Sequence, residues 1–339
     1  GCVGIGGIVG LNGGYIYNCA LSGNFGNAGL NYLGGIASIN IQTSQETKNY
    51  TDKTYTAGTI EDCRTEQGRT VTGKDCVGGI VSWNLTDGLV KNCASAANVT
   101  AAGNCAGGTA GRNSGLIELA DASSDTAART VQGSRGEGVG GVVGVNEAGG
   151  QLSISGGQNS QVVAAGSGLT VMGQSSVGGI IGINEGSLGN EITYLVSQVK
   201  LVRASKGNAG GVVGTSRGKI TQAVNRSDDV RADEGPAGGI TAVNESVITG
   251  CVNYGNVTSS AGYVGGIVAE NKGTIADSRV NDTNGGTVTL IGRGKDEMGA
   301  VCALNEGTIK GSMPVANVKL AGTASIFGGI AGRNKGIIE

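Results

Sequence analysis

A pattern of apolar and small residues around paired glycines recurs along the whole chain and predicts its fold. The pattern first reads Gly6-Gly7-Ile8-Val9-Gly10-Leu11-Asn12. Successive copies start 27 to 44 residues apart, so a core unit repeats with insertions of varying length. A fixed-period repeat of this kind indicates a solenoid in which each copy stacks on the next. The eleven copies start at Gly6, Gly34, Gly78, Gly107, Gly140, Gly178, Gly210, Gly238, Gly265, Gly299 and Gly328.

Aligning the copies in columns, with the first glycine as column one, predicts three short strands per copy. Column zero is always apolar, and column three is always Ile, Val or Thr, which favours a strand. Column five is always small, which permits close approach of another layer. An apolar residue four positions after column seven, such as Ile16, begins the second strand, and stretches such as Asn98-Val99-Thr100 form the third.

Column seven is Asn in ten of the eleven copies, the exception being Ser216. Asn tolerates a left-handed backbone and hydrogen-bonds its neighbours in a turn, so we expect a turn to follow the first strand here. If the copies stack about 4.8 Å apart, each amide also reaches the next, forming a ladder. The predicted ladder consists of Asn12, Asn40, Asn84, Asn113, Asn146, Asn184, Asn244, Asn271, Asn305 and Asn334.

The repeat therefore predicts an all-β fold, a right-handed parallel β-solenoid of about eleven rungs with three short strands per rung. We interpret residues 1–339 as one domain because the pattern runs through the whole chain. Long polar stretches without periodicity predict surface insertion loops near 41–57, 121–137 and 156–168. The chain stops midway through a copy, so we expect it to be a segment of a longer protein.

Composition excludes several classes of protein. Glycine supplies 67 of 339 residues, but there are only 2 prolines and no strict triplet period, which excludes collagen. Charge is balanced, with 24 basic against 26 acidic residues and no basic cluster, so no nucleic-acid partner is expected. No apolar run approaches the ~20 residues that span a bilayer, so we predict no membrane span in this segment.

The chain contains no His, which removes Ser-His-Asp and Cys-His triads and His-containing metal sites. Four carboxylates directly follow the column-seven Asn, at Glu147, Glu185, Glu245 and Glu306. Such a column could bind Ca²⁺ or a glycan, but Arg217 and Lys272 interrupt it, which favours a solvated edge. We therefore predict no catalytic, cofactor-binding or metal-binding residues.

Eight cysteines occur, and no spacing among them resembles a zinc site. Ala and Ser occupy the column of Cys19, Cys63 and Cys93 in other copies, so buried free thiols are the favoured interpretation. Cys76 and Cys105 each lie two residues before a repeat start in adjacent copies, which makes them the best candidates for a disulfide.

The pattern Gly-Gly-Ile/Val-Val-Gly-x-Asn-x-Gly-x-Ile, often followed by Asn-Cys-x-x-x-Gly-Asn-Val, resembles the GLUG-motif repeats of large secreted or wall-anchored bacterial surface proteins. The resemblance covers essentially the whole chain and implies an extracellular, cell-surface location. The resemblance assigns to this sequence only the repeat's Gly, Ile and Asn columns. Thr109 and Ser216 depart from the residue types of these columns.

Three functional hypotheses follow. The favoured one is a structural and adhesive module, a rigid rod or filament component that presents loops to a host or environmental glycan or protein without catalysis. The alternative is a β-helical protein that binds or cleaves polysaccharide. Ice binding ranks lower because regular Thr-x-Thr columns are missing.

We also expect self-association, lateral or head-to-tail. Columns three and four are both apolar, as in Ile180-Ile181, and neighbouring strand residues point to opposite faces. One of the two columns should then form an outward apolar stripe suited to side-by-side packing. Open strand edges would add the head-to-tail route.

Overall fold

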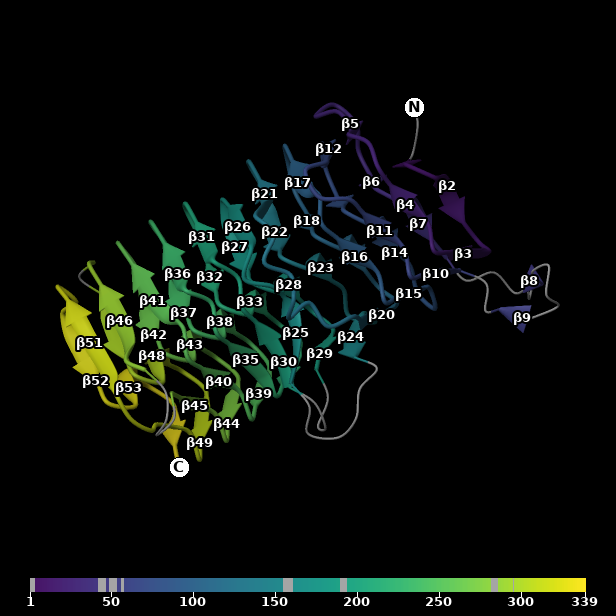
Figure 1. Cartoon of the computed structure of the whole chain (residues 1–339). Coiled ribbons are helices and arrows are strands. Elements are labelled where there is room, and N and C mark those ends of the chain that lie inside the picture. The colour runs from purple at the N-terminus through teal and green to yellow at the C-terminus, as the bar shows by residue number, and fades with distance from the viewer. Residues whose placement is uncertain are drawn as a thin grey trace.

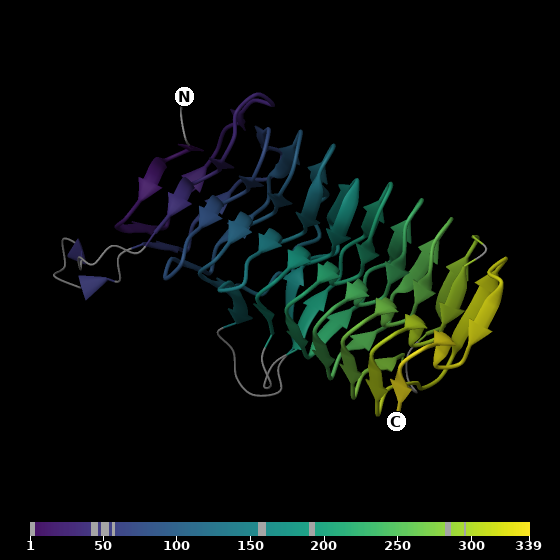
Figure 2. The same cartoon turned by 180° about the vertical axis from the view of Figure 1, so that it is seen from behind.

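The computed structural model describes residues 4–41, 47–48, 54–55, 58–154, 161–189, 194–281, 286–294 and 296–339. These residues form a parallel β-solenoid of about ten turns with three strands per turn, which confirms the predicted fold class. Figures 1 and 2 show the turns stacked in chain order from the N-terminal to the C-terminal end. The described residues contain no helix, and therefore none long and apolar enough to cross a membrane.

The turn that begins at Val77 shows how one repeat folds, because all of its strands are regular. The first predicted strand is divided into two pieces, and so is the second, whereas the third is continuous. In the order of the chain this gives two pieces, two pieces and one strand. The pieces are β13 (Val77–Gly78), β14 (Val81–Asn84), β15 (Leu89–Lys91), β16 (Ala94–Ser95) and β17 (Asn98–Ala101).

Equivalent pieces of successive turns pair in parallel and form sheets along the solenoid. Three sheets have eleven strands: sheet A from β1 (Ile5–Gly6) to β52 (Ile326–Gly328), sheet B from β2 (Val9–Asn12) to β53 (Ala331–Asn334), and sheet C from β3 (Tyr15–Tyr17) to β54 (Ile337–Ile338). Sheet E has ten strands, from β5 (Phe25–Gly26) to β51 (Val318–Gly322).

The remaining side is split between two shorter sheets. Sheet D has three strands, β4 (Ala20–Leu21), β11 (Arg64–Thr65) and β16. Sheet G has six, starting with β25 (Gln161–Ala165) and β30 (Tyr194–Ser197) and ending with β50 (Met313–Pro314). No strand continues this side in the turn between β16 and β25, where residues 120–128 lie.

A sharp bend at columns two and three divides the first strand, and it requires glycine in column one. A Cβ added to Gly34 would lie 1.8 Å from the carbonyl oxygen of Ala37. The bend turns columns three and four into the core together, so Ile180 and Ile181 are both fully buried. The predicted outward stripe at columns three and four is therefore wrong, because strict alternation does not hold across a bend.

The second strand is broken by a left-handed residue between sheet C and sheet D or G. Asn18, Asp62 and Asn92 occupy this position with φ of 51°, 54° and 50°. Asn and Asp are the residues that adopt this conformation most readily after glycine. Asn12 and Asn244, in column seven, are the last residues of strands of sheet B, and the expected bend follows each of them. Gly14 N donates to Asn12 Oδ1 and Ser246 N donates to Asn244 Oδ1, both at 3.2 Å, so the side chains bond their neighbours in the turn without a left-handed backbone.

Small residues in column five let sheet B approach the backbone of the sheet A strands. A Cβ added to Gly182 would lie 2.3 Å from the backbone nitrogen of Val139, and one added to Gly214 would lie 2.4 Å from the carbonyl carbon of Ser176. The core inside the sheets is a single continuous cluster dominated by Ile, Val and Leu.

All three predicted insertion loops contain strands among their described residues. Within 121–137, Arg129–Gly133 forms β21 of sheet E, and Glu137 begins β22 (Glu137–Gly140). Within 156–168, Gln161–Ala165 forms β25, whereas residues 156–160 lie outside the described residues. Strands β21 and β25 were not predicted because neither lies in a Gly-Gly copy, although Val131 of β21 pairs in register with Val99. In 41–57 only an antiparallel pair is described beyond Ile41, β8 (Thr47–Lys48) with β9 (Thr54–Tyr55).

An outward apolar column does exist, on sheet G, but the chain covers it. Its members form a small cluster separate from the main core, and Ala122, Tyr194 and Tyr254 pack against it. Each member is at most 7% exposed. This column consists of Val163, Val196, Val224 and Val252.

Candidate binding surface along the asparagine ladder

Column seven forms a continuous series of side-chain hydrogen bonds along much of the solenoid. Each amide Nδ2 donates to the Oδ1 of the Asn in the next turn, at 2.7 to 2.9 Å. Each Nδ2 also donates to a nearby backbone carbonyl, as Asn113 does to Gly115 at 3.1 Å. All of the predicted ladder residues take part; the bonds join Asn12 to Asn40, Asn84, Asn113, Asn146 and Asn184, and Asn244 to Asn271, Asn305 and Asn334.

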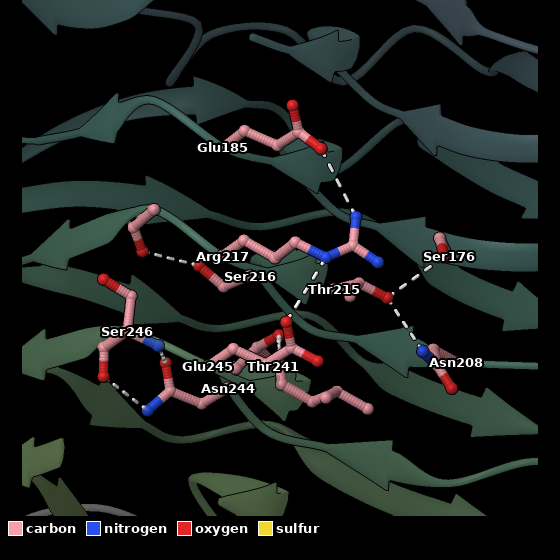
Figure 3. A network of polar contacts seen from close by, with 12 residues as sticks. Ser176, Glu185, Asn208, Thr215, Ser216, Arg217, Thr241, Asn244, Glu245 and Ser246 are labelled. Atoms are coloured by element: carbon pink, nitrogen blue, oxygen red, sulfur yellow. Dashed lines mark hydrogen bonds and ion pairs between the residues drawn. The ribbon is translucent and has the colours of Figure 1, made fainter. Parts of the chain in front are cut away.

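Ser216 interrupts the ladder; Figure 3 shows it together with Asn244, which holds column seven in the next turn. Asn184 Nδ2 lies 3.5 Å from Ser216 Oγ, at the limit of a hydrogen bond, while Ser216 Oγ donates to the carbonyl of Gly218 at 2.8 Å. Arg217, the next residue, lies 3.3 Å from a carboxylate on either side, Glu185 and Glu245. An ion-pair bridge on the surface therefore spans the turns where the buried ladder is weak.

The four carboxylates that follow the ladder are all ion-paired. Glu185 and Glu245 share Arg217, and Glu306 lies 3.0 Å from Lys335. Glu147 lies 2.5 Å from Arg112 and also accepts a short hydrogen bond from Ser114. Within the described residues no group of three or more Cys, Asp or Glu side chains could hold a metal ion. The arrangement is a charge-balanced edge in which each of these carboxylates faces a basic side chain.

An aromatic stack lies beside this edge at the N-terminal half of the ladder. The rings of Tyr32 and Trp83 are 6.2 Å apart and inclined by 17°, and the Arg112 guanidinium lies 5.1 Å from the Trp83 ring centroid. Tyr32 comes from the turn before Trp83, and Arg112 from the turn after it. The indole therefore lies between Tyr32 and Arg112, and its Nε1 donates to Ser114 Oγ at 3.2 Å.

Sequence reasoning did not identify this stack. Trp83 and Arg112 occupy column six, and Tyr32 lies directly before column zero of the preceding copy. The same two columns meet again where Asn208 donates to Thr215 at 2.8 Å and where Arg333 pairs with Glu297. The sequence carries no signal that these two columns face each other, because the contact depends on how the turns pack.

Cys76 and Cys105 are brought together next to Arg112. Both are buried free thiols at left-handed positions, with φ of 52° and 54°, and their sulfur atoms are 2.9 Å apart. The hydrogen bond donated by Cys76 lowers the pKa of Cys105, and the same bond raises the pKa of Cys76 above its ordinary value. The pair therefore contains one thiol that ionises more readily than usual, beside a second within reach of it.

No family model, curated protein or solved structure matches the chain. The resemblance to GLUG-motif repeats therefore rests on the repeat columns alone. Along the ladder, the geometry offers an edge of paired charges beside the stack of Tyr32, Trp83 and Arg112.

Proposed function

We propose that the chain is a structural and adhesive module, a rigid rod or filament component of a bacterial surface protein that presents binding surfaces outside the cell. The observation that carries this proposal is the in-register stacking of sheets A, B and C through eleven strands each. Every turn contacts mainly its neighbours, so the number of turns sets the length of the rod.

The use of polar side chains supports a mechanical role. The column-seven amides bond to one another, and the carboxylates beside them are neutralised by Arg112, Arg217 and Lys335. The alternative, a protein that cleaves polysaccharide, would draw support from a carboxylate pair directed at a groove, and this column does not supply one. The extracellular location and bacterial source belong to the proposal through the GLUG-like repeat.

Self-association remains part of the proposal in its head-to-tail form. Core-column residues of the first and last turns, Ile8, Phe327 and Ile338, are 45%, 46% and 43% exposed. An adjoining layer, from the same polypeptide or from a second copy, would cover them. Lateral association was expected from an exposed apolar stripe at columns three and four. Because both columns are buried, we do not propose it.

One experiment separates adhesion from catalysis. Beads coated with mucin, xylan, pectin or cellulose are incubated with the chain, and protein retention and release of new reducing ends are measured in the same tubes. The adhesive proposal expects retention on at least one surface with no new reducing ends. Release of products would favour the enzyme, and absence of retention on every surface would contradict the adhesive role.

A further inference from the structure

The interruption of one side of the solenoid creates a cavity. Sheet D ends at β16 and sheet G begins at β25, and residues 120–128 cross the turn between them without forming a strand. A cavity of about 210 Å³ lies where the strand is missing. Its walls are mainly small or apolar, and they include Cys93, Thr109, Val142 and Ala164.

The crossing segment is fixed to the next turn by its backbone. Ala122 N donates to the carbonyl of Val163 at 2.8 Å, and Arg129 N donates to the carbonyl of Gly168 at 3.1 Å. Asp121 Oδ1 accepts a hydrogen bond from the backbone nitrogen of Val163 at 3.1 Å. The wall of the cavity is therefore held in place by the fold.

An ion pair lines this cavity. The Arg129 side chain is only 8% exposed, and its Nη1 lies 2.5 Å from Asp125 Oδ2. Although this contact is close, Nη1 has no hydrogen-bond acceptor in a suitable geometry. Nη1 therefore meets the Asp125 carboxylate as an ion pair without a regular hydrogen bond, which is unusual because buried donors almost always make one.

We propose that this cavity binds one neutral sugar residue of a glycan through two adjacent hydroxyl groups. One hydroxyl oxygen accepts a hydrogen bond from Arg129, and its neighbour donates one to the Asp125 carboxylate. The small apolar walls contact the C–H groups of the ring. The cavity is smaller than the ~300 Å³ at which pockets for drug-sized ligands begin, which suits a single residue.

The charge of the pair selects a neutral ligand. Asp125 already balances Arg129, so a uronate, sialate or phosphate would place its charge beside the Asp125 carboxylate. An amine would meet the Arg129 guanidinium in the same way. Hydroxyl groups donate and accept together, so a diol satisfies both partners without adding charge.

The inference deepens the proposed function, and it rests on that function only in taking the sugar to be part of a glycan. The test uses the full chain and saturation-transfer NMR with glucose, galactose, mannose, N-acetylglucosamine, N-acetylgalactosamine, glucuronate and inorganic phosphate. We expect at least one neutral sugar to bind, and to bind more tightly than glucuronate or phosphate.

Two variants locate the site. Asp125→Asn should weaken binding of that sugar about tenfold, because a charge-assisted hydrogen bond is lost. Ala164→Leu, which keeps the ion pair but fills the cavity, should abolish binding. Arg203→Gln serves as the matched control, because Arg203 pairs with Asp233 at 2.8 Å on the exposed face of sheet E. It should leave binding unchanged, and circular dichroism should show all three variants folded.

Absence of binding by every neutral sugar, tighter binding of glucuronate or phosphate, or unchanged binding in both folded site variants would overturn the inference. If the Ala164→Leu variant is still retained on glycan-coated beads, the proposal that the cavity binds the glycan is wrong, but the proposed adhesive role of the rod is not affected. If the native chain is not retained on any of the coated beads, the proposed adhesive role of the rod is wrong, whatever the cavity binds.

Discussion

Asn184 and Ser216 face each other in column seven, and the 3.5 Å between Nδ2 and Oγ makes this the weakest described contact of the ladder. Replacing Ser216 with Asn should let this position accept from Asn184 and donate to Asn244, as equivalent residues do elsewhere. We expect Ser216→Asn to raise the free energy of unfolding by about 1 kcal/mol, the usual net value of a hydrogen bond. Urea unfolding followed by far-UV circular dichroism measures this, and an unchanged or lowered midpoint would count against the ladder as a stabilising element.

Asn146 tests the ladder from the other direction. Asn146→Ala leaves the Asn113 amide donor and the Asn184 carbonyl oxygen without their ladder partners, and all three residues are buried. We expect a loss of about 2–4 kcal/mol, because two buried polar groups each lose a hydrogen-bond partner. Lys272→Ala, one column further out and exposed, should change the same urea midpoint little. Equal effects of the two substitutions would contradict this explanation.

The Cys76 and Cys105 thiols should be joined by mild oxidation. Diamide, which takes two electrons and two protons from the pair, should produce a single disulfide between them, and intact-mass measurement should show the loss of two hydrogens. The closed loop of about 29 residues should stabilise the chain by about 3–4 kcal/mol in the chain-entropy model. Recovery of both cysteines as alkylated thiols after diamide treatment would show that the bond does not form. Cys76→Ser provides the control that cannot form it.

Glu270 should make stability depend on pH in an identifiable direction. It occupies column six between Val243 and Leu304, and burial raises its pKa, with Glu306 and Asp296 adding to the effect. A carboxyl group whose folded pKa is raised favours the folded state below its ordinary value of 4.5, and this contribution is lost as pH rises through the folded value. Glu270→Gln should therefore be more stable than the native chain at neutral pH and equally stable in acid. A gain that persists unchanged in acid would exclude this cause.

The repeat columns could be predicted because the copies can be compared with one another. A residue type that recurs in the same column of most of the eleven copies is unlikely to be accidental. Asn12 and its equivalents indicate stacking at strand spacing, and the structure shows their amides bonded at that spacing. The outward stripe was predicted wrongly because strand alternation was applied across Gly34 and its equivalents, where the backbone bends. A periodicity argument holds only within one straight element.

The cavity could not be predicted from the sequence. Asp125 and Arg129 lie in a stretch without periodicity, and their position depends on where sheet D stops and sheet G begins. The Tyr32–Trp83 stack also depends on which neighbouring turns bring two columns together, and the 50 residues between Tyr32 and Trp83 do not indicate this. Both features arise from the packing of turns and not from the repeat itself.

The proposal that the chain acts as a rigid rod depends on a fixed distance between turns, and a spin-label distance tests this most directly. Thr70 and Asn256 occupy one outward column of sheet E, six turns apart by strand register. Labels on Thr70→Cys and Asn256→Cys should be separated by about 29 Å, at ~4.8 Å per strand, with the label's own length adding to the width. A Cys19→Ala background removes the half-buried native thiol among the described residues. The account predicts one narrow distance distribution near this value; a broad distribution, or several distances, would show that the turns do not form a rigid rod.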